Sequence, residues 1–345
     1  MAAIAVIFAL VMGLGNAADF GVFYKTALDL RTLGWASVYD VHGITPYHYH
    51  PFTALLFLPS TYLTFPLAKW VWAILNGWWL WDSYRLAKQH FKVADGPVLL
   101  GLAFCVYPLT WQMKFGNTSV FLAWAVLIAL TTRRQWLGDA LLALLILIKL
   151  TLVGWLPLLL LTGHSRRAGR MLIWIGGASL FAWLLAGSST YESWWLTLND
   201  PLTAHNYSKN DNQSWYALTY RYKTLWNMNA VFLTGTAVFG LVYLKQLWPL
   251  RRREDVVLVT AALPWLWCGP LSWIHHQILL WPVFVGALAP LTPKPWTSRH
   301  TVLVVVWLLL NGITSLFLGS PLSLTAHEWG VPLLGFALLL STIRP

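Results

Sequence analysis

Long apolar stretches recur along the whole chain and alternate with short polar ones. Residues 1–15 form the first, read as an uncleaved helix because it has no basic residue ahead of it. Further apolar stretches lie at 66–84, 97–111, 117–132, 137–148, 151–162, 171–187, 229–247, 256–271, 277–291, 301–318 and 329–343. A spanning helix needs roughly 20 mostly apolar residues, and we expect an all-α polytopic membrane protein with about 12 transmembrane helices.

Two longer polar regions interrupt this pattern. The first, residues 16–65, is expected to form an outward loop that carries an interfacial helix at 20–33 and a short apolar piece at 51–63. This piece contains Pro59 and is too short for a full span, which favours a re-entrant or interfacial segment. The second is a large outward loop at 188–228. The whole chain, 1–345, is expected to form a single membrane domain.

Composition agrees with a membrane setting: 58% of the residues are hydrophobic, 10% are charged, and the net charge is +11. The basic residues gather in short clusters between apolar stretches, as orientation in a cell membrane requires, so the charge does not indicate nucleic acid as a partner. These clusters alternate between the two sides only if 137–162 is two short helices that meet near Lys149. The loops around residues 16–65, 116–117 and 188–228, and the pair His275-His276, then share the outward, extracytoplasmic face.

Ionisable groups beside apolar segments are costly and therefore informative. Asp19 follows the first apolar helix directly, and Lys149 interrupts a run of aliphatic residues. Lys149 suits a phosphate-binding role as a point charge, although snorkelling to the interface explains it equally well. His275 and His276 begin an apolar stretch and point about 100° apart on a helix, which argues against joint metal ligation.

The loop at 188–228 is rich in Asn, Gln, Trp and Tyr, a composition that suits sugar hydroxyls but also describes an ordinary polar loop. Cys105 and Cys268 lie in apolar stretches and are read as packing residues. The chain contains no Walker loop, Gly-x-Ser-x-Gly elbow, His-Glu-x-x-His or cysteine cluster. These absences give no support to a nucleotide-driven or hydrolytic mechanism, and we expect no cofactor.

Several motifs follow one another in an order that resembles the bacterial polyprenol-phosphate-mannose-dependent α-1,2-mannosyltransferases, glycosyltransferase family 87 of the GT-C superfamily. Asp19 with Phe23-Tyr24 resembles the first-loop signature, and Tyr49-His50-Pro51 resembles a Tyr-x-Pro entry. Gly116-Asn117 stands where the family usually has Gly-Gln, and Lys149 where it has an isolated lysine. The matches continue with Asn212-Gln213-Ser214 followed by Arg221, and with Ser272-Trp273-Ile274-His275-His276.

This resemblance implies a GT-C fold and an inverting, metal-independent transfer of a sugar, expected to be mannose. The donor would be a polyprenyl-phosphate sugar in the bilayer, and the acceptor a glycolipid or glycan. Asp19 would act as the base, and Lys149, Arg221 or one of His275 and His276 would hold the leaving phosphate. The resemblance further places Tyr24, Tyr49, Asn117, Asn212, Gln213 and Ser214 in substrate binding.

Two other classes remain open on the residues alone. A lipid-linked saccharide flippase or transporter would also need an aqueous cavity with basic lining, and would move its substrate without chemistry. A different polyprenyl-phosphate-using transferase, such as a polymerase or ligase, would share the lipid substrate but has no reason to place an acid in the first loop.

Overall fold

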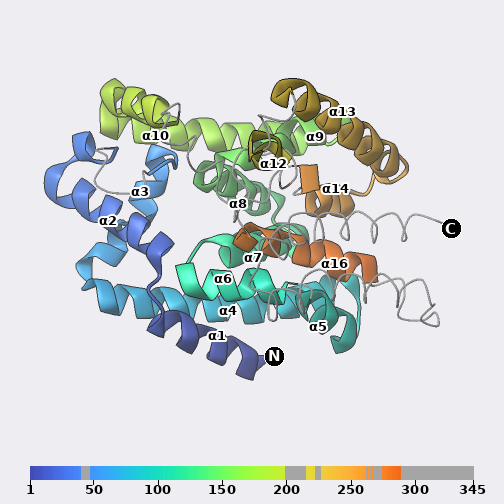
Figure 1. The fold of residues 1–345 in the computed structure, drawn as a ribbon, viewed down its shortest axis with the longest axis horizontal. Coiled ribbons are helices and arrows are strands. Elements are labelled where there is room, and N and C mark those ends of the chain that lie inside the picture. The colour runs from blue at the N-terminus through green and yellow to red at the C-terminus, as the bar shows by residue number, and fades with distance from the viewer. Residues whose placement is uncertain are drawn as a thin grey trace. The chain divides into compact units, whose positions relative to one another are not determined.

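A computed structural model describes residues 1–39, 47–103, 105–198, 215–221, 227–261, 263, 264, 266 and 274–288. This described part is helical and contains no strand, which confirms the all-α class (Figure 1). The chain divides into two compact units. The first comprises residues 1–83, 112–157 and 164–203, and the second comprises 84–111, 158–163 and 204–345. The expected single membrane domain stays a prediction.

The first unit is built from the N-terminal helices and the helices around residue 149. Their bounds are α1 Ala2–Leu14, α2 Ala18–Leu33, η1 Trp35–Ser37, α3 Pro51–Phe57, η2 Leu58–Tyr62, the first part of α4 Phe65–Phe91, α7 Ser119–Thr131, α8 Gln135–Ile148, η3 Leu150–Gly154 and α10 Ser165–Leu198. Within this unit α3 packs against both α2 and α10, and α8 packs against α7 and α10 (Figure 1).

The second unit holds α5 Asp95–Ala103, α12 Trp215–Arg221, α13 Met228–Leu247, η4 Trp248–Leu250, α14 Glu254–Thr260, η5 Ile274–Leu280 and α16 Trp281–Leu288. Like α4, the helices α6 Val106–Phe115 and α9 Trp155–Leu161 have residues in both units. Inside the second unit, α16 packs on α5, where Trp281 Nε1 donates to the carbonyl of Val98 at 3.2 Å.

The described residues include two helices long and apolar enough to cross a membrane, Ser165–Leu198 and Met228–Leu250. Three bent pairs raise this to five if each counts as one span: Ala2–Leu14 with Ala18–Leu33, Pro51–Tyr62 with Phe65–Phe91, and Pro108–Phe115 with Ser119–Thr131. A membrane protein is therefore supported. The expected total of about 12 spans stays a prediction, and its last two stretches, 301–318 and 329–343, lie outside the described residues.

The segment at 51–63 is helical and ends in a sharp bend, which fits either a broken span or a re-entrant loop, so its re-entrant or interfacial nature stays a prediction. His50 caps α3 and Pro51 occupies its first turn, where proline needs no backbone hydrogen-bond partner. The chain then turns through 115° into α4. Side chains of α2 bind the far end of this segment: Arg31 Nη1 donates to the carbonyl of Thr61 at 2.5 Å, and the Tyr24 hydroxyl donates to that of Leu63 at 2.8 Å.

The 137–162 stretch is broken where the charge pattern requires it. Helix α8 ends at Ile148, and Lys149 has non-helical dihedral angles of φ −136° and ψ 84°. A 3-10 turn, η3, follows directly and leads into α9. This confirms two short helices that meet at Lys149.

Three boundaries differ from expectation. The helix expected at 20–33 begins at Ala18, so Asp19 lies in its first turn rather than in a loop. The stretch 97–111 is divided between α5 and α6. The loop expected from residue 188 begins later, because helix resumes after a break at Gly187 (φ 77°) and continues to Leu198. Only glycine adopts such a φ readily, which explains a sharp break inside an apolar helix.

Candidate active site

Two backbone turns meet beside Asp19. Ala17 has φ 48° at the start of α2, and Gly116 has φ 68° between α6 and α7. A Cβ on Gly116 would lie 3.1 Å from the Ala17 Cβ and 3.3 Å from the Phe20 Cβ. The Ala17 N–H donates to the Lys114 carbonyl at 3.2 Å. A glycine is thus required at 116 both for its φ and for this close approach.

This contact brings Asn117 to the predicted base. Asn117 Nδ2 donates to Asp19 Oδ2 at 2.8 Å, although 98 residues separate them in the chain. The Asn117 side chain is buried, and its Oδ1 accepts from the Ser119 hydroxyl at 3.0 Å. Because Oδ1 is occupied by a donor, the amide nitrogen is the end that faces the carboxylate. Asp19 itself is half-buried.

A buried polar chain, not anticipated from the sequence, holds this turn in place. Gln112 Nε2 donates to the Asn117 carbonyl and, at 3.3 Å, to Asn76 Oδ1. Trp72 Nε1 donates to the Gly116 carbonyl at 2.8 Å. The sequence signal for this chain was the presence of amide side chains, Asn76 and Gln112, within the apolar helices α4 and α6, because buried amides require hydrogen-bond partners.

Tyr49 and Lys149 also lie within electrostatic reach of the Asp19 carboxylate. Burial, and then the negative charge of Asp19, raise the pKa of Tyr49. The same carboxylate acts electrostatically on Lys149, whose side chain is buried at the end of α8. Thr53 Oγ1 donates to the Leu147 carbonyl at 3.1 Å and so fixes α3 beside this helix end. We call Asp19, Tyr49, Asn117 and Lys149 the Asp19 cluster.

A second group of side chains holds the segment that carries Tyr49. His50 Nδ1 accepts the Phe52 N–H at 3.1 Å, which leaves Nε2 as the protonated nitrogen of the neutral ring. Nε2 lies 3.2 Å from the Ser179 hydroxyl and 3.4 Å from that of Tyr191. Tyr191 also donates to the Ser179 carbonyl at 2.8 Å, across the Gly187 break of α10. From the sequence, His50 was only the middle residue of the Tyr-x-Pro motif and had no role of its own.

Other predicted site residues are placed less completely. The Tyr24 hydroxyl is bonded to Leu63, and its substrate contact stays a prediction. Residues Asn212, Gln213 and Ser214 lie outside the described residues, and Arg221 ends α12 with its side chain outside them too. His275 and His276 lie in η5 of the second unit, where His276 is buried. Their grouping with Asp19 stays a prediction.

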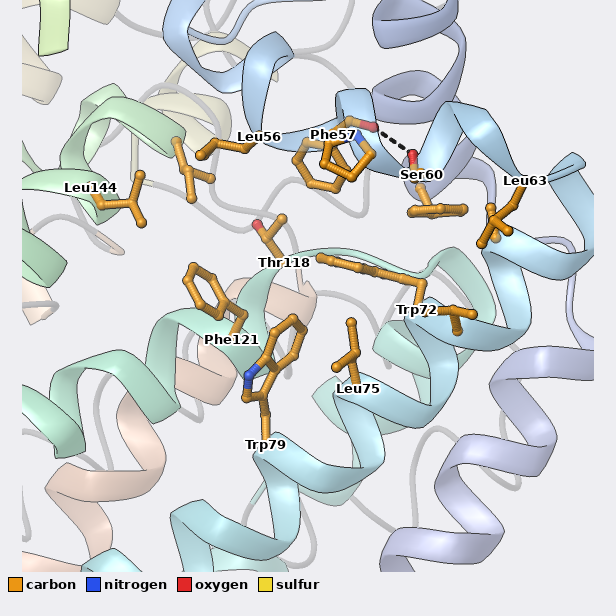
Figure 2. Close-up of a pocket in the computed structure, with 15 residues that line it drawn as sticks. Leu56, Phe57, Ser60, Leu63, Trp72, Leu75, Trp79, Thr118, Phe121 and Leu144 are labelled. Carbon is orange, nitrogen blue, oxygen red and sulfur yellow. Dashed lines mark hydrogen bonds between the residues drawn. The ribbon is translucent and has the colours of Figure 1, made fainter.

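An apolar cavity of about 380 Å³ borders the Asp19 cluster. Three of its lining residues are chain neighbours of cluster residues: Phe20 follows Asp19, Thr118 follows Asn117, and Ile148 precedes Lys149. Figure 2 shows Leu56 and Phe57 on one side of the cavity and Leu75, Trp79 and Phe121 on the other. The site therefore combines a carboxylate, a cation and an adjoining apolar space.

Within the described ranges no three His, Cys, Asp or Glu side chains are grouped so that they could hold a metal ion. The expectation of a reaction without metal or cofactor stays a prediction. Lys149 is one basic residue that the described part of the chain places within electrostatic reach of the carboxylate.

Comparison with known proteins identifies relatives of this chain. A polyprenol-phosphate-mannose-dependent α-(1-2)-phosphatidylinositol pentamannoside mannosyltransferase of Mycolicibacterium smegmatis is 28% identical over 290 residues, covering 76% of this chain and 68% of the relative. A polyprenol-phosphate-mannose-dependent α-(1-2)-phosphatidylinositol mannoside mannosyltransferase of Mycobacterium tuberculosis is 25% identical over 286 residues, covering 76% and 65%. The chain thus spans about two thirds of these relatives' length. No solved structure matches it.

Glycosyltransferase family 87 matches residues 47–267. This range includes Tyr49, Asn117 and Lys149 but begins after Asp19. The assignment of Asp19 therefore depends on its hydrogen bond to Asn117 and on its electrostatic influence on Tyr49 and Lys149. Since the match covers more than half of the chain, and the helices and apolar composition indicate a membrane protein, the chain belongs to glycosyltransferase family 87 and is a membrane glycosyltransferase.

Proposed function

We propose that this protein transfers mannose from a polyprenyl-phosphate donor to a hydroxyl group of a mannosylated phosphoinositide or similar glycolipid. The observation that supports this proposal is the Asp19 cluster, in which a carboxylate, an amide that orients it and a lysine lie together beside an apolar cavity. The donor and acceptor classes are supported by the names of the mycobacterial relatives.

Asp19 would act as the general base. It takes the proton of the acceptor hydroxyl while the hydroxyl oxygen attacks the anomeric carbon of mannose. The bond from that carbon to the phosphate oxygen breaks, and its electron pair leaves with polyprenyl phosphate. Attack opposite to the leaving group inverts the anomeric configuration. Asn117 donates to Asp19 Oδ2 and so orients the carboxylate.

Lys149 would stabilise the charge that develops on the leaving phosphate. A positioned cation in a site from which water is largely excluded stabilises such a charge by several kcal/mol. Because the leaving group is a phosphomonoester, one or two protein cations suffice, and Arg221 and His275 or His276 are proposed to supply the rest. The proposed location is the cell membrane, with the site on the extracytoplasmic face.

The experiment uses purified protein, polyprenyl-phosphate mannose with a labelled sugar, and phosphatidylinositol mannosides as acceptors. Asp19→Asn should lower the transfer rate by roughly 10²- to 10⁴-fold, the contribution of a general base. Asp29→Asn is the matched control, because Asp29 lies on the same helix in an exposed ion pair with Lys25. Equal rates for Asp19→Asn and Asp29→Asn would remove Asp19 from the mechanism.

The same preparation separates transfer from transport. A flippase would move the labelled lipid across a vesicle membrane without forming a mannosylated product, and Asp19→Asn would leave that movement largely intact. Cysteines placed at 19 and 275, in a background without Cys105 and Cys268, test the shared face. Labelling of the two positions from opposite sides of the membrane would refute a common site.

A further inference from the structure

We propose that the apolar cavity formed by α3, η2, α4 and α7 binds the first isoprene units of the donor's polyprenyl chain, and so selects the donor by its lipid. This inference rests on the proposed function and extends it to a defined part of the molecule. The occupant is the donor chain rather than an acyl chain of the acceptor.

The cavity adjoins the proposed phosphate ligand. Its lining includes Ile148, the residue before Lys149, which is the proposed phosphate ligand. In the donor, the prenyl chain is attached directly to the phosphate. A phosphate held by Lys149 therefore brings the first isoprene units to this cavity. The acceptor, by contrast, must reach Asp19 with a sugar hydroxyl, so its acyl chains begin farther from the reacting atoms.

The chemistry of the lining carries the second step. Leu56, Phe57, Leu75, Trp79 and Phe121 surround the space, and Figure 2 shows their side chains directed into it. The Thr118 and Ser60 hydroxyls in the lining have partners: Thr118 donates to Asn117 Oδ1 at 3.4 Å and Ser60 to the Phe57 carbonyl at 2.6 Å. Such a surface suits a hydrocarbon with flat double bonds. The volume, about 380 Å³, lies within the range of roughly 300–1,000 Å³ typical of ligand pockets.

The route into the cavity carries the third step. Three lining residues, Leu56, Val71 and Leu75, are between 38% and 41% exposed. An exposed apolar rim on a membrane protein faces lipid, so a chain that already lies in the bilayer can enter without crossing water. Because that chain leaves one apolar environment for another, selection comes from shape and packing rather than from the hydrophobic effect.

The cavity is also preformed. Trp72 stacks on Phe20 with ring centroids 5.3 Å apart and is fixed by its hydrogen bond to the Gly116 carbonyl. Phe20 follows Asp19 in the chain, and Gly116 precedes Asn117, so both partners of Trp72 are neighbours of cluster residues. A prenyl chain that packs against Trp72 therefore contacts the residue that also supports the turn of Asn117.

The test fills the cavity and varies the donor chain. Leu75→Trp introduces a large ring into the space, whereas Ile74→Trp places the same ring on the outer face of α4, where Ile74 is 61% exposed. Two mannosyl phosphates serve as donors, one with a full-length polyprenyl chain and one with a single prenyl unit. Leu75→Ala, which enlarges the cavity, is the second variant if Leu75→Trp does not fold.

We expect Leu75→Trp to lower kcat/KM for the long-chain donor about tenfold or more, the usual effect of overfilling a packed site, with a smaller change for the short donor. Ile74→Trp should leave the ratio between donors as in the unchanged protein. Leu75→Ala should also lower kcat/KM more for the long-chain donor than for the short one, because packing contacts with the chain are lost. A ratio that is unchanged in Leu75→Trp, or changed equally in Ile74→Trp, would overturn the inference while transfer itself continued.

A binding measurement separates this inference from the proposed function. Polyprenyl phosphate with a photoreactive diazirine on its first isoprene unit should cross-link to peptides of α4 and α7 that contain Trp79 and Phe121. Cross-linking there without any mannose transfer would support the cavity and refute the transferase. Transfer without such cross-linking, or cross-linking by an acceptor glycolipid labelled on its acyl chain, would refute the assignment of the cavity.

Discussion

Replacing Asn117 by Asp tests whether the amide of this residue maintains Asp19 as a base. The substitution keeps the size of the side chain and puts a carboxylate where Nδ2 now lies 2.8 Å from Asp19 Oδ2. Two carboxylates at that separation cannot both ionise readily and share one proton instead. The proton would occupy the group that must accept one from the acceptor.

The size of the effect follows from two contributions. Asn117 orients the Asp19 carboxylate, and a small misplacement of a catalytic group lowers the rate by up to about 10²-fold. Asn117→Ala should show this loss together with a modest shift of the acidic limb to higher pH, because a bond that favours the charged carboxylate is removed. Asn117→Asp should show a larger loss at neutral pH, and its acidic limb should move to higher pH because the shared proton must first be removed.

The assay is initial-rate mannose transfer over a pH series, with protein folding checked by thermal unfolding in detergent. Asn227→Asp is the charge-matched control, because Asn227 caps the exposed start of α13 and Asp serves equally well there. If Asn117→Asp kept a profile that superimposed on that of Asn227→Asp, the hydrogen bond to Asp19 would have no catalytic role.

Three further outcomes are expected. Asp139→Ala should destabilise the protein by about 3–5 kcal/mol in detergent unfolding, because Asp139 is fully buried and pairs with buried Arg167 at 2.5 Å. The control Asp29→Ala should lower stability by at most about 1 kcal/mol, and equal losses in the two variants would contradict this. Burial lowers the pKa of His50 to about 4, so between pH 6.5 and 4 the unfolded chain gains a proton that the folded chain does not. The free energy of unfolding at pH 4 should therefore be lower than at neutral pH by up to about 3 kcal/mol on account of His50. In His50→Asn this contribution should be absent. Gly116→Ala should reduce transfer more than stability, since its Cβ would push the turn away from α2; a rate within twofold of the parent would argue against this close approach.

The site residues that the sequence predicts are those whose placement costs free energy whatever the rest of the fold. An acid after an apolar helix and a lysine within an aliphatic run are expensive wherever the chain folds, and Asp19 and Lys149 stand out for that reason. The break at Lys149 followed from the alternation of basic clusters, and the bend after 51–63 from its length and Pro59. These features depend on the bilayer and on short-range geometry alone.

The contacts that organise the site depend on residues far apart in the chain. Asn117 reaches Asp19 across 98 residues, and His50 reaches Tyr191 across 141. No local pattern specifies which buried amide meets which carboxylate, because this is decided by how α2 and the turn at 116–117 pack. The continuation of α10 after Gly187 was missed for a different reason: polar residues such as Ser188, Ser189 and Thr190 resemble a loop but are tolerated on a helix with an exposed face.

The two side-chain bonds that α2 makes to the segment at 51–63 have a consequence for biosynthesis. The carbonyls of Thr61 and Leu63 are bonded by Arg31 and Tyr24, and an unbonded carbonyl in a bilayer costs several kcal/mol. Helix α2 leaves the ribosome before 51–63 does, so its donors are already present when this segment emerges. We therefore expect α2 and 51–63 to insert as a pair, and a chain that starts beyond Arg31 to retain 51–63 at the membrane less well.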